Sequence, residues 1–100
     1  MDTIRQVEID EAGRLLVTPD STRFPYIYRE AMEVHWDDAR GFLFAPKPRE
    51  WSYLDWFRQI LEAAKAQGGE LRLSERTRWI TVPDDVVAEM RAYGAKASSK

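Results

Sequence analysis

The chain of 100 residues contains no cysteine and a single histidine, and these two features exclude several classes of protein. Without cysteine there are no disulfides, thiolate nucleophiles, iron–sulfur clusters or cysteine-ligated zinc sites. A lone histidine excludes the metal motifs that need two, so we expect neither a metal nor a cofactor. The lack of cysteine also suits a reducing compartment, and we expect a cytoplasmic protein.

Long apolar runs and blocks of like charge are also missing. A membrane-spanning helix needs about 18 or more consecutive apolar residues, and the sequence has no such run. No apolar segment of the signal-peptide type follows the first residues. Lys and Arg total 15 against 17 Asp and Glu, with no basic stripe for phosphates or for a membrane surface. We therefore expect no nucleic-acid partner and no membrane partner.

What is present suffices for one hydrophobic core. Hydrophobic residues make up 44% of the chain and aromatic residues 12%, which is typical of a packed globular protein. At this length we expect one domain, over residues 1–94. The small and polar residues 95–100 predict a flexible C-terminal tail.

The clearest predicted element is a helix over residues 52–67. Ser52 followed by Asp55 has the spacing of a capping box, and Gly68 with Gly69 predicts the end of the helix. Apolar residues fill about half of the helix circumference, which predicts one buried face. A second helix is predicted over residues 84–93, opened by Pro83 and two acidic residues and ended by Gly94.

Alternation of apolar and polar residues predicts three β-hairpins. Their strand pairs are 7–10 with 14–18, 32–37 with 42–45, and 70–73 with 78–82. In the second hairpin the period of two places Met32, Val34 and Trp36 on one face and Glu33, His35 and Asp37 on the other. Residues 24–31 fit either a short helix opened by Ser21 or Thr22 or an irregular strand, and Pro25 favours a short helical turn. The fold class predicted from these elements is α+β: an antiparallel sheet built of hairpins, with two main helices packed on one face.

The most unusual stretch runs from Lys47 to Phe57. It contains four aromatic residues within seven positions, preceded by two cations, which is more than a core requires. Trp, Tyr and Arg are enriched at the energetic centres of binding surfaces. The same pattern also fits a structural role, in which Trp51 packs as a hydrophobic staple against Trp56. The candidate binding residues of this stretch are Lys47, Arg49, Trp51, Tyr53 and Trp56, where Lys47 and Arg49 would hold a carboxylate or a phosphate.

His35 is the one candidate general base, and we expect it to be a solvated or structural residue first and a ligand-binding one second. No predicted turn or strand brings a nucleophile beside it, so the sequence yields no catalytic residues. An alternative hypothesis places a small-molecule site, or a small enzyme, at a pocket formed by His35, Arg49 and Tyr28.

Two stretches of the chain carry a family resemblance. One runs from Phe24 to Ala31 and leads into Val34-His35-Trp36-Asp37; the other runs from Lys47 to Tyr53, adds Trp56-Phe57, and is followed by Trp79 and Val82-Pro83. Together they resemble small uncharacterised bacterial proteins carried in integron gene cassettes, over about residues 7–93. The resemblance implies an accessory protein of a mobile gene and supplies no catalytic residues.

The function predicted from the sequence is a non-enzymatic binding module. Its aromatic and basic segment would hold a partner protein or form a homodimer. The small-molecule site near His35, Arg49 and Tyr28 remains the alternative.

Overall fold

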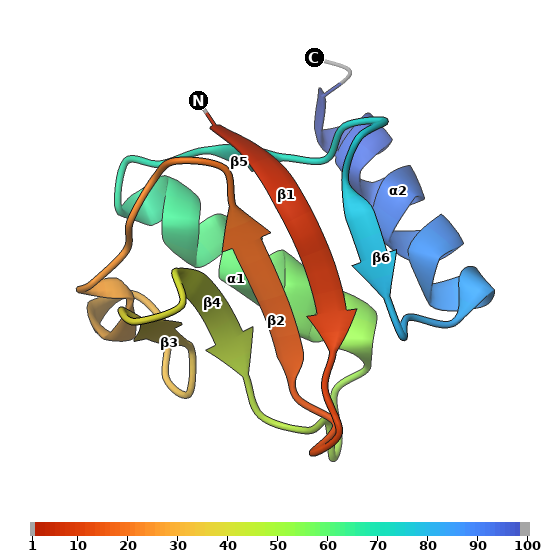
Figure 1. The fold of residues 1–100 in the computed structure, drawn as a ribbon, viewed down its shortest axis with the longest axis horizontal. Coiled ribbons are helices and arrows are strands. Elements are labelled where there is room, and N and C mark those ends of the chain that lie inside the picture. The colour runs from red at the N-terminus through yellow and green to blue at the C-terminus, as the bar shows by residue number, and fades with distance from the viewer. Residues whose placement is uncertain (1, 99–100) are drawn as a thin grey trace.

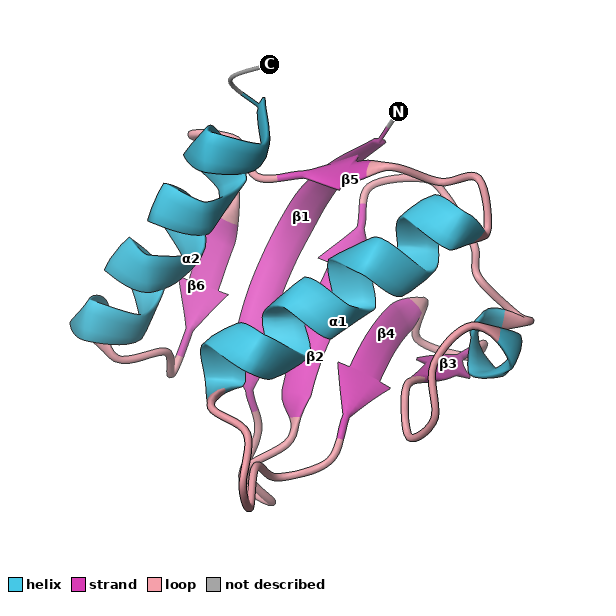
Figure 2. Cartoon of the chain, turned by 180° about the vertical axis from the view of Figure 1, so that it is seen from behind, coloured by secondary structure: helices cyan, strands magenta, loops and turns pink. Residues whose placement is uncertain are grey.

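The computed structural model describes residues 2–98. Over this range the chain forms a six-stranded sheet of β1 (Asp2–Ile9), β2 (Leu15–Pro19), β3 (His35–Asp37), β4 (Phe42–Ala45), β5 (Leu71–Arg72) and β6 (Arg78–Ile80). The helices of the same range are α1 (Tyr53–Ala66), α2 (Asp84–Ser98) and a 3₁₀ turn, η1 (Ile27–Arg29). Figures 1 and 2 show α1 and α2 on the same face of the sheet. This arrangement confirms the predicted α+β class.

The first two predicted hairpins are present. β1 pairs with β2 and β3 pairs with β4, both antiparallel, and β2 pairs with β4 to join the two hairpins into one sheet. Gly13 and Gly41 occupy the two hairpin turns with φ of 82° and 76°, a backbone region that costs glycine little. The predicted helical turn over residues 24–31 is confirmed as η1.

The predicted strand over residues 32–37 is wrong at its start, because β3 begins only at His35. Glu33 has a φ of 66°, in the left-handed region, and the Val34 N–H donates to the Ala31 carbonyl in a turn. This turn interrupts the alternation, so Met32 is 87% exposed while Val34 is fully buried.

The third predicted hairpin is wrong. β5 and β6 do not pair with each other: each runs parallel to β1, β5 beside Asp2 and Thr3 and β6 beside residues 6–8. Between the two pairings, the Thr77 hydroxyl donates to the Ile4 carbonyl, 2.7 Å away, and ties the connection between β5 and β6 to β1. The sheet is therefore antiparallel from β3 to β1 and parallel beyond β1.

Helix α1 begins and ends as the sequence predicts. The Ser52 Oγ accepts from the Asp55 N–H, and the Asp55 carboxylate accepts from the Ser52 N–H, both at 3.1 Å, which is a complete capping box. At the other end the Gly68 N–H donates to the Lys65 carbonyl and the Gly69 N–H to the Ala64 carbonyl, with Gly68 at a φ of 88°. These two bonds form a Schellman motif, which satisfies carbonyls at the helix end.

Helix α2 is longer than predicted. It continues through Gly94 to Ser98, because Gly94 does not adopt the positive φ that ends a helix. The predicted tail at residues 95–100 therefore begins inside this helix, and residues 99 and 100 lie outside the described residues. No helix within residues 2–98 is long and apolar enough to cross a membrane.

The core lies between the helices and the sheet. Fully buried side chains come from every layer: the sheet, η1, α1 and α2, among them Val7, Val17, Leu43, Ile27, Phe57, Ile60 and Met90. Gly69 is fixed by this core, since a Cβ there would lie 2.6 Å from the Phe24 ring. The chain needs glycine at this point for close packing.

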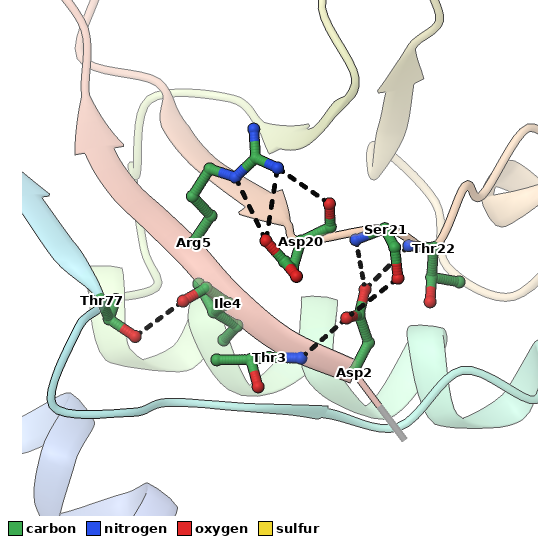
Figure 3. A network of polar contacts seen from close by, with 8 residues as sticks. All are labelled: Asp2, Thr3, Ile4, Arg5, Asp20, Ser21, Thr22 and Thr77. Atoms are coloured by element: carbon green, nitrogen blue, oxygen red, sulfur yellow. Dashed lines mark hydrogen bonds and ion pairs between the residues drawn. The ribbon is translucent and has the colours of Figure 1, made fainter.

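Polar contacts fix the start of β1 beside the end of β2 (Figure 3). The Asp2 carboxylate accepts hydrogen bonds from the N–H groups of Thr3, Ser21 and Thr22, at 2.8 to 3.0 Å. Partial burial by itself would raise the pKa of Asp2, but the backbone hydrogen bonds, led by those of Ser21 and Thr22, outweigh it and lower the pKa to about 2. The Arg5 guanidinium adds an ion pair with Asp20.

Candidate functional site

A groove of about 670 Å³ lies beside helix α1 and contains much of the unusual aromatic and basic segment. We call it the α1 groove. Its lining comes from two loop segments and one helix face: Glu30, Ala31, Met32, Glu33; Pro46, Lys47, Arg49, Glu50, Trp51; and Trp56 and Gln59 of α1. Four of the seven candidate residues from the sequence therefore line one groove.

The start of α1 positions the two tryptophans. Ser52 is the N-cap, so Trp51 immediately precedes the cap and Trp56 is the fourth residue of the helix. Their rings pack with centroids 4.8 Å apart and planes tilted by 48°, which is the hydrophobic staple predicted from the sequence. Trp51 nevertheless remains 45% exposed. The staple and the binding surface are thus compatible, because packing on Trp56 occupies only part of the Trp51 side chain.

The two cations of the groove are exposed and make no ion pair with any residue in the described range 2–98. Arg5, Arg14, Arg23 and Arg72, in contrast, each have a carboxylate partner. The aliphatic stem of Lys47 packs over Gly13, where a Cβ would lie 2.9 Å from the Lys47 Cγ and Cδ atoms. Lys47 is therefore held by its stem, which leaves its ammonium group available for a ligand.

The opposite segment supplies carboxylates and one exposed apolar side chain. The Glu30 carboxylate accepts a hydrogen bond from the Gln67 side-chain amide, just beyond the end of α1. Met32 is the most exposed of the large hydrophobic residues, at 87%. The left-handed backbone at Glu33 turns the chain here and separates Met32 from strand β3.

Tyr53 lies outside the groove and has a structural contact. Its hydroxyl donates to the Gly13 carbonyl at 2.8 Å, which ties the first turn of α1 to the β1–β2 turn. Burial raises the pKa of Tyr53, and the nearby Asp10 carboxylate raises it further. Both effects keep the hydroxyl protonated, as a hydrogen-bond donor must be.

His35 and Tyr28 also lie outside the groove, so the structure does not bring them together with Arg49 there. His35 is exposed on β3, with its ring 5.4 Å from that of Phe44. Tyr28, in η1, is 56% exposed, and the Arg29 guanidinium lies 5.9 Å from its ring. The groove thus includes one of the three residues in the alternative hypothesis.

Sequence reasoning missed the segment 30–33 and Gln59. The aromatic excess identified the 47–56 half of the groove, because that signal lies within one short stretch. Glu30 and Glu33 carry no local signal, since they become part of the site only when η1 is placed next to α1.

Comparison with known proteins identifies the family. A family model described as Integron Cassette Protein Hfx_Cass5 matches residues 2–77, a range that includes every residue of the α1 groove. The chain belongs to this family. This confirms the resemblance to integron cassette proteins found in the sequence.

A solved structure with the same description is also similar to this chain. Described as the integron cassette protein Hfx_Cass5 from the mobile metagenome of the North West Arm sewage outfall, it is 47% identical to this chain. The match covers 95% of this chain and 96% of the relative, with a TM-score of 0.47. No curated protein matches the chain. The Hfx_Cass5 description names no activity or partner, so the function must be argued from the site.

Proposed function

We propose that this member of the Hfx_Cass5 family is a non-enzymatic binding module that holds a segment of a partner protein in the α1 groove. One observation carries the proposal: the groove combines the exposed Trp51, fixed on Trp56, with Lys47 and Arg49, which have no ion pair in the described chain. Trp and Arg are the residue types that contribute most to protein–protein affinity.

The staple favours binding for an energetic reason. Ordering a side chain at an interface costs about 0.5–1.5 kcal/mol in lost rotamer freedom. Trp51 is already restricted by its contact with Trp56, so less of this cost remains when a partner binds. Met32, on the opposite segment, adds a flexible apolar surface that adapts to different shapes.

Self-association through the same segment is one form of this proposal. It predicts a wild-type dimer in light scattering that becomes a monomer when Trp51 is changed to Ala. The alternative small-molecule site gains no support from the groove, because His35 and Tyr28 do not line it. The cytoplasmic location remains a prediction from composition.

Selection of peptides from a random display library tests the proposal and does not require the partner to be identified first. The selected peptides are measured against the wild type, Trp51→Ala, and the control Tyr26→Ala. Tyr26 is an exposed aromatic residue (52%) that does not line the groove. We expect the peptides to bind the wild type and Tyr26→Ala equally, and to bind Trp51→Ala about 30-fold more weakly, as for a hot spot of about 2 kcal/mol.

Urea denaturation of Trp51→Ala confirms that the variant is folded. Peptides that bind Trp51→Ala as tightly as the wild type would show that the groove is not the binding surface. The proposal also fails if the library gives no groove-dependent peptide and light scattering shows no association that depends on Trp51.

A further inference from the structure

The two loop segments of the α1 groove contact α1 at two different places. The packing of Trp51 against Trp56 places the end of segment 46–51 beside the first turns of α1. The hydrogen bond from Gln67 to Glu30 places the segment 30–33 beside the helix C-terminus. From α1 itself only Trp56 and Gln59, in its first two turns, line the groove; Figure 2 shows α1 lying across the sheet.

The two segments carry net charges of opposite sign, and we call them the basic end and the acidic end of the groove. Segment 46–51 has Lys47 and Arg49 against one acid, Glu50, for a net charge of +1. Segment 30–33 has Glu30 and Glu33 and no basic residue, for a net charge of −2. The hydrogen bond on Glu30 comes from a neutral amide, so it leaves this negative charge uncompensated.

Apolar side chains accompany both ends. Ala31 and Met32 belong to one segment, Pro46 and Trp51 to the other, and Trp56 lies on the helix. A ligand with charge of one sign would gain at one end and be repelled at the other. Single-signed polymers such as nucleic acid are therefore disfavoured by the acidic end.

We infer that the α1 groove recognises an extended protein segment with acidic residues at one end, basic residues at the other and apolar residues between them. The acidic end of the bound segment would lie beside Lys47 and Arg49 and its basic end beside Glu30 and Glu33. This assignment rests on the proposed function and adds the chemistry and the orientation of the partner.

Synthetic hexapeptides of matched length and apolar content test the charge order. The dipolar probe has two aspartates, two leucines and two lysines in that order. In the comparison probes the charged residues are all aspartate or all lysine. Binding is measured by titration of the ¹⁵N-labelled protein, following the indole N–H signals of Trp51 and Trp56, with those of Trp36 and Trp79 as internal references outside the groove.

The dipolar peptide is expected to bind about 10-fold more tightly than either uniform peptide at low salt. Each exposed ion pair contributes a factor of about 1.5 to 5, and the uniform peptides replace attraction by repulsion at one end. The difference should shrink as salt screens the exposed charges.

Charge-reversal variants assign each end. Glu33→Lys should weaken binding of the dipolar peptide and strengthen binding of the all-aspartate peptide, each several-fold. Glu11→Lys makes the same charge change in an exposed turn outside the groove and should change neither affinity. Arg49→Glu should favour the all-lysine peptide in the same way, with Arg40→Glu as its control.

The outcomes separate this inference from the proposed function. If the signals of Trp51 and Trp56 respond equally to the three peptides, the groove binds protein segments but the charge assignment is overturned. The assignment is also overturned if none of the peptides binds, even where library-selected peptides bind in a Trp51-dependent manner. A response confined to Trp36 or Trp79 contradicts both.

Discussion

The Thr77 hydroxyl provides a direct test of how the parallel part of the sheet is held. Thr77 is the one buried polar or charged residue within residues 2–94, the range whose side chains the structure describes, at 5% exposure. Its Oγ donates to the Ile4 carbonyl at 2.7 Å and accepts from the Ser74 N–H at 2.9 Å. Ile4 lies between the residues of β1 that pair with β5 and those that pair with β6, so this hydroxyl bridges the gap between the two pairings (Figure 3).

Thr77→Val removes both hydrogen bonds and changes the shape of the side chain little. The buried Ile4 carbonyl would lose this partner, which costs about 1–3 kcal/mol of stability. The half-buried Ser74 N–H would lose its hydrogen bond to the hydroxyl, which costs a further amount of about 0.5–1.5 kcal/mol. We expect the free energy of unfolding to fall by about 2–4 kcal/mol. For a domain of this size that lowers Tm by roughly 10–20 °C.

Urea denaturation of the wild type, Thr77→Val and Thr77→Ser measures the effect. Serine keeps the hydroxyl and loses one methyl group, so it should cost only about 1 kcal/mol. The urea midpoint is therefore expected to be highest for the wild type, lower for Thr77→Ser and lowest for Thr77→Val, while the dependence of the unfolding free energy on urea concentration stays unchanged. A valine variant as stable as the wild type would refute the reasoning, because it would show that the hydroxyl contributes nothing to the junction of β1, β5 and β6.

Three further predictions concern charge and backbone. Asp2 has a folded-state pKa of about 2 against 3.8 for the unfolded chain, so it stabilises the fold by roughly 1–2 kcal/mol after reduction for solvent screening. This stabilisation is complete above about pH 4 and is lost as the pH falls toward 2. Asp2→Asn should therefore be less stable at pH 7 and show a flatter acid denaturation curve, and an unchanged curve would contradict the assignment. Thr81 is β-branched and has a φ of 57°, so Thr81→Gly should raise the free energy of unfolding by about 0.5–1 kcal/mol in urea, whereas a loss would show that the residue is not strained. Gly69→Ala should destabilise by about 1–3 kcal/mol through its clash with Phe24. Gly68→Ala meets open space and should lose only about 1 kcal/mol through its positive φ; equal losses at the two glycines would argue against the clash.

Features encoded within a few residues could be predicted. The capping box of Ser52 with Asp55, the staple of Trp51 with Trp56 and the end of α1 at Gly68 all depend on groups less than two helical turns apart. The hairpins closed at Gly13 and Gly41 are local in the same sense. Their signals could be read because the interacting groups are adjacent in the chain, whatever the rest of the fold does.

Features that depend on distant partners could not be predicted. Leu71–Arg72 and Arg78–Ile80 have the spacing of a hairpin, but both pair with β1, some seventy residues earlier, and the Thr77 bond to Ile4 has no sequence signature. The predicted end of the second helix at Gly94 is also wrong, because glycine ends a helix only when its φ becomes positive. The spacing of the two strands is compatible with a hairpin or with pairing to β1, and the glycine at position 94 is compatible with the end of a helix or with its continuation.

The sequence by itself determined the α+β class, helix α1 with its caps, and the half of the candidate site from Lys47 to Trp56. The tertiary structure decided the parallel pairings of β1 and brought Glu30 and Glu33 into the same groove, while leaving His35 and Tyr28 outside it. The reason is physical: helix caps, staples and tight turns are fixed by contacts between near neighbours, whereas strand order and the meeting of two loops depend on how the whole core packs. The opposite charges of the two segments of the α1 groove also depend on how the core packs, since each segment alone carries a net charge of only one sign.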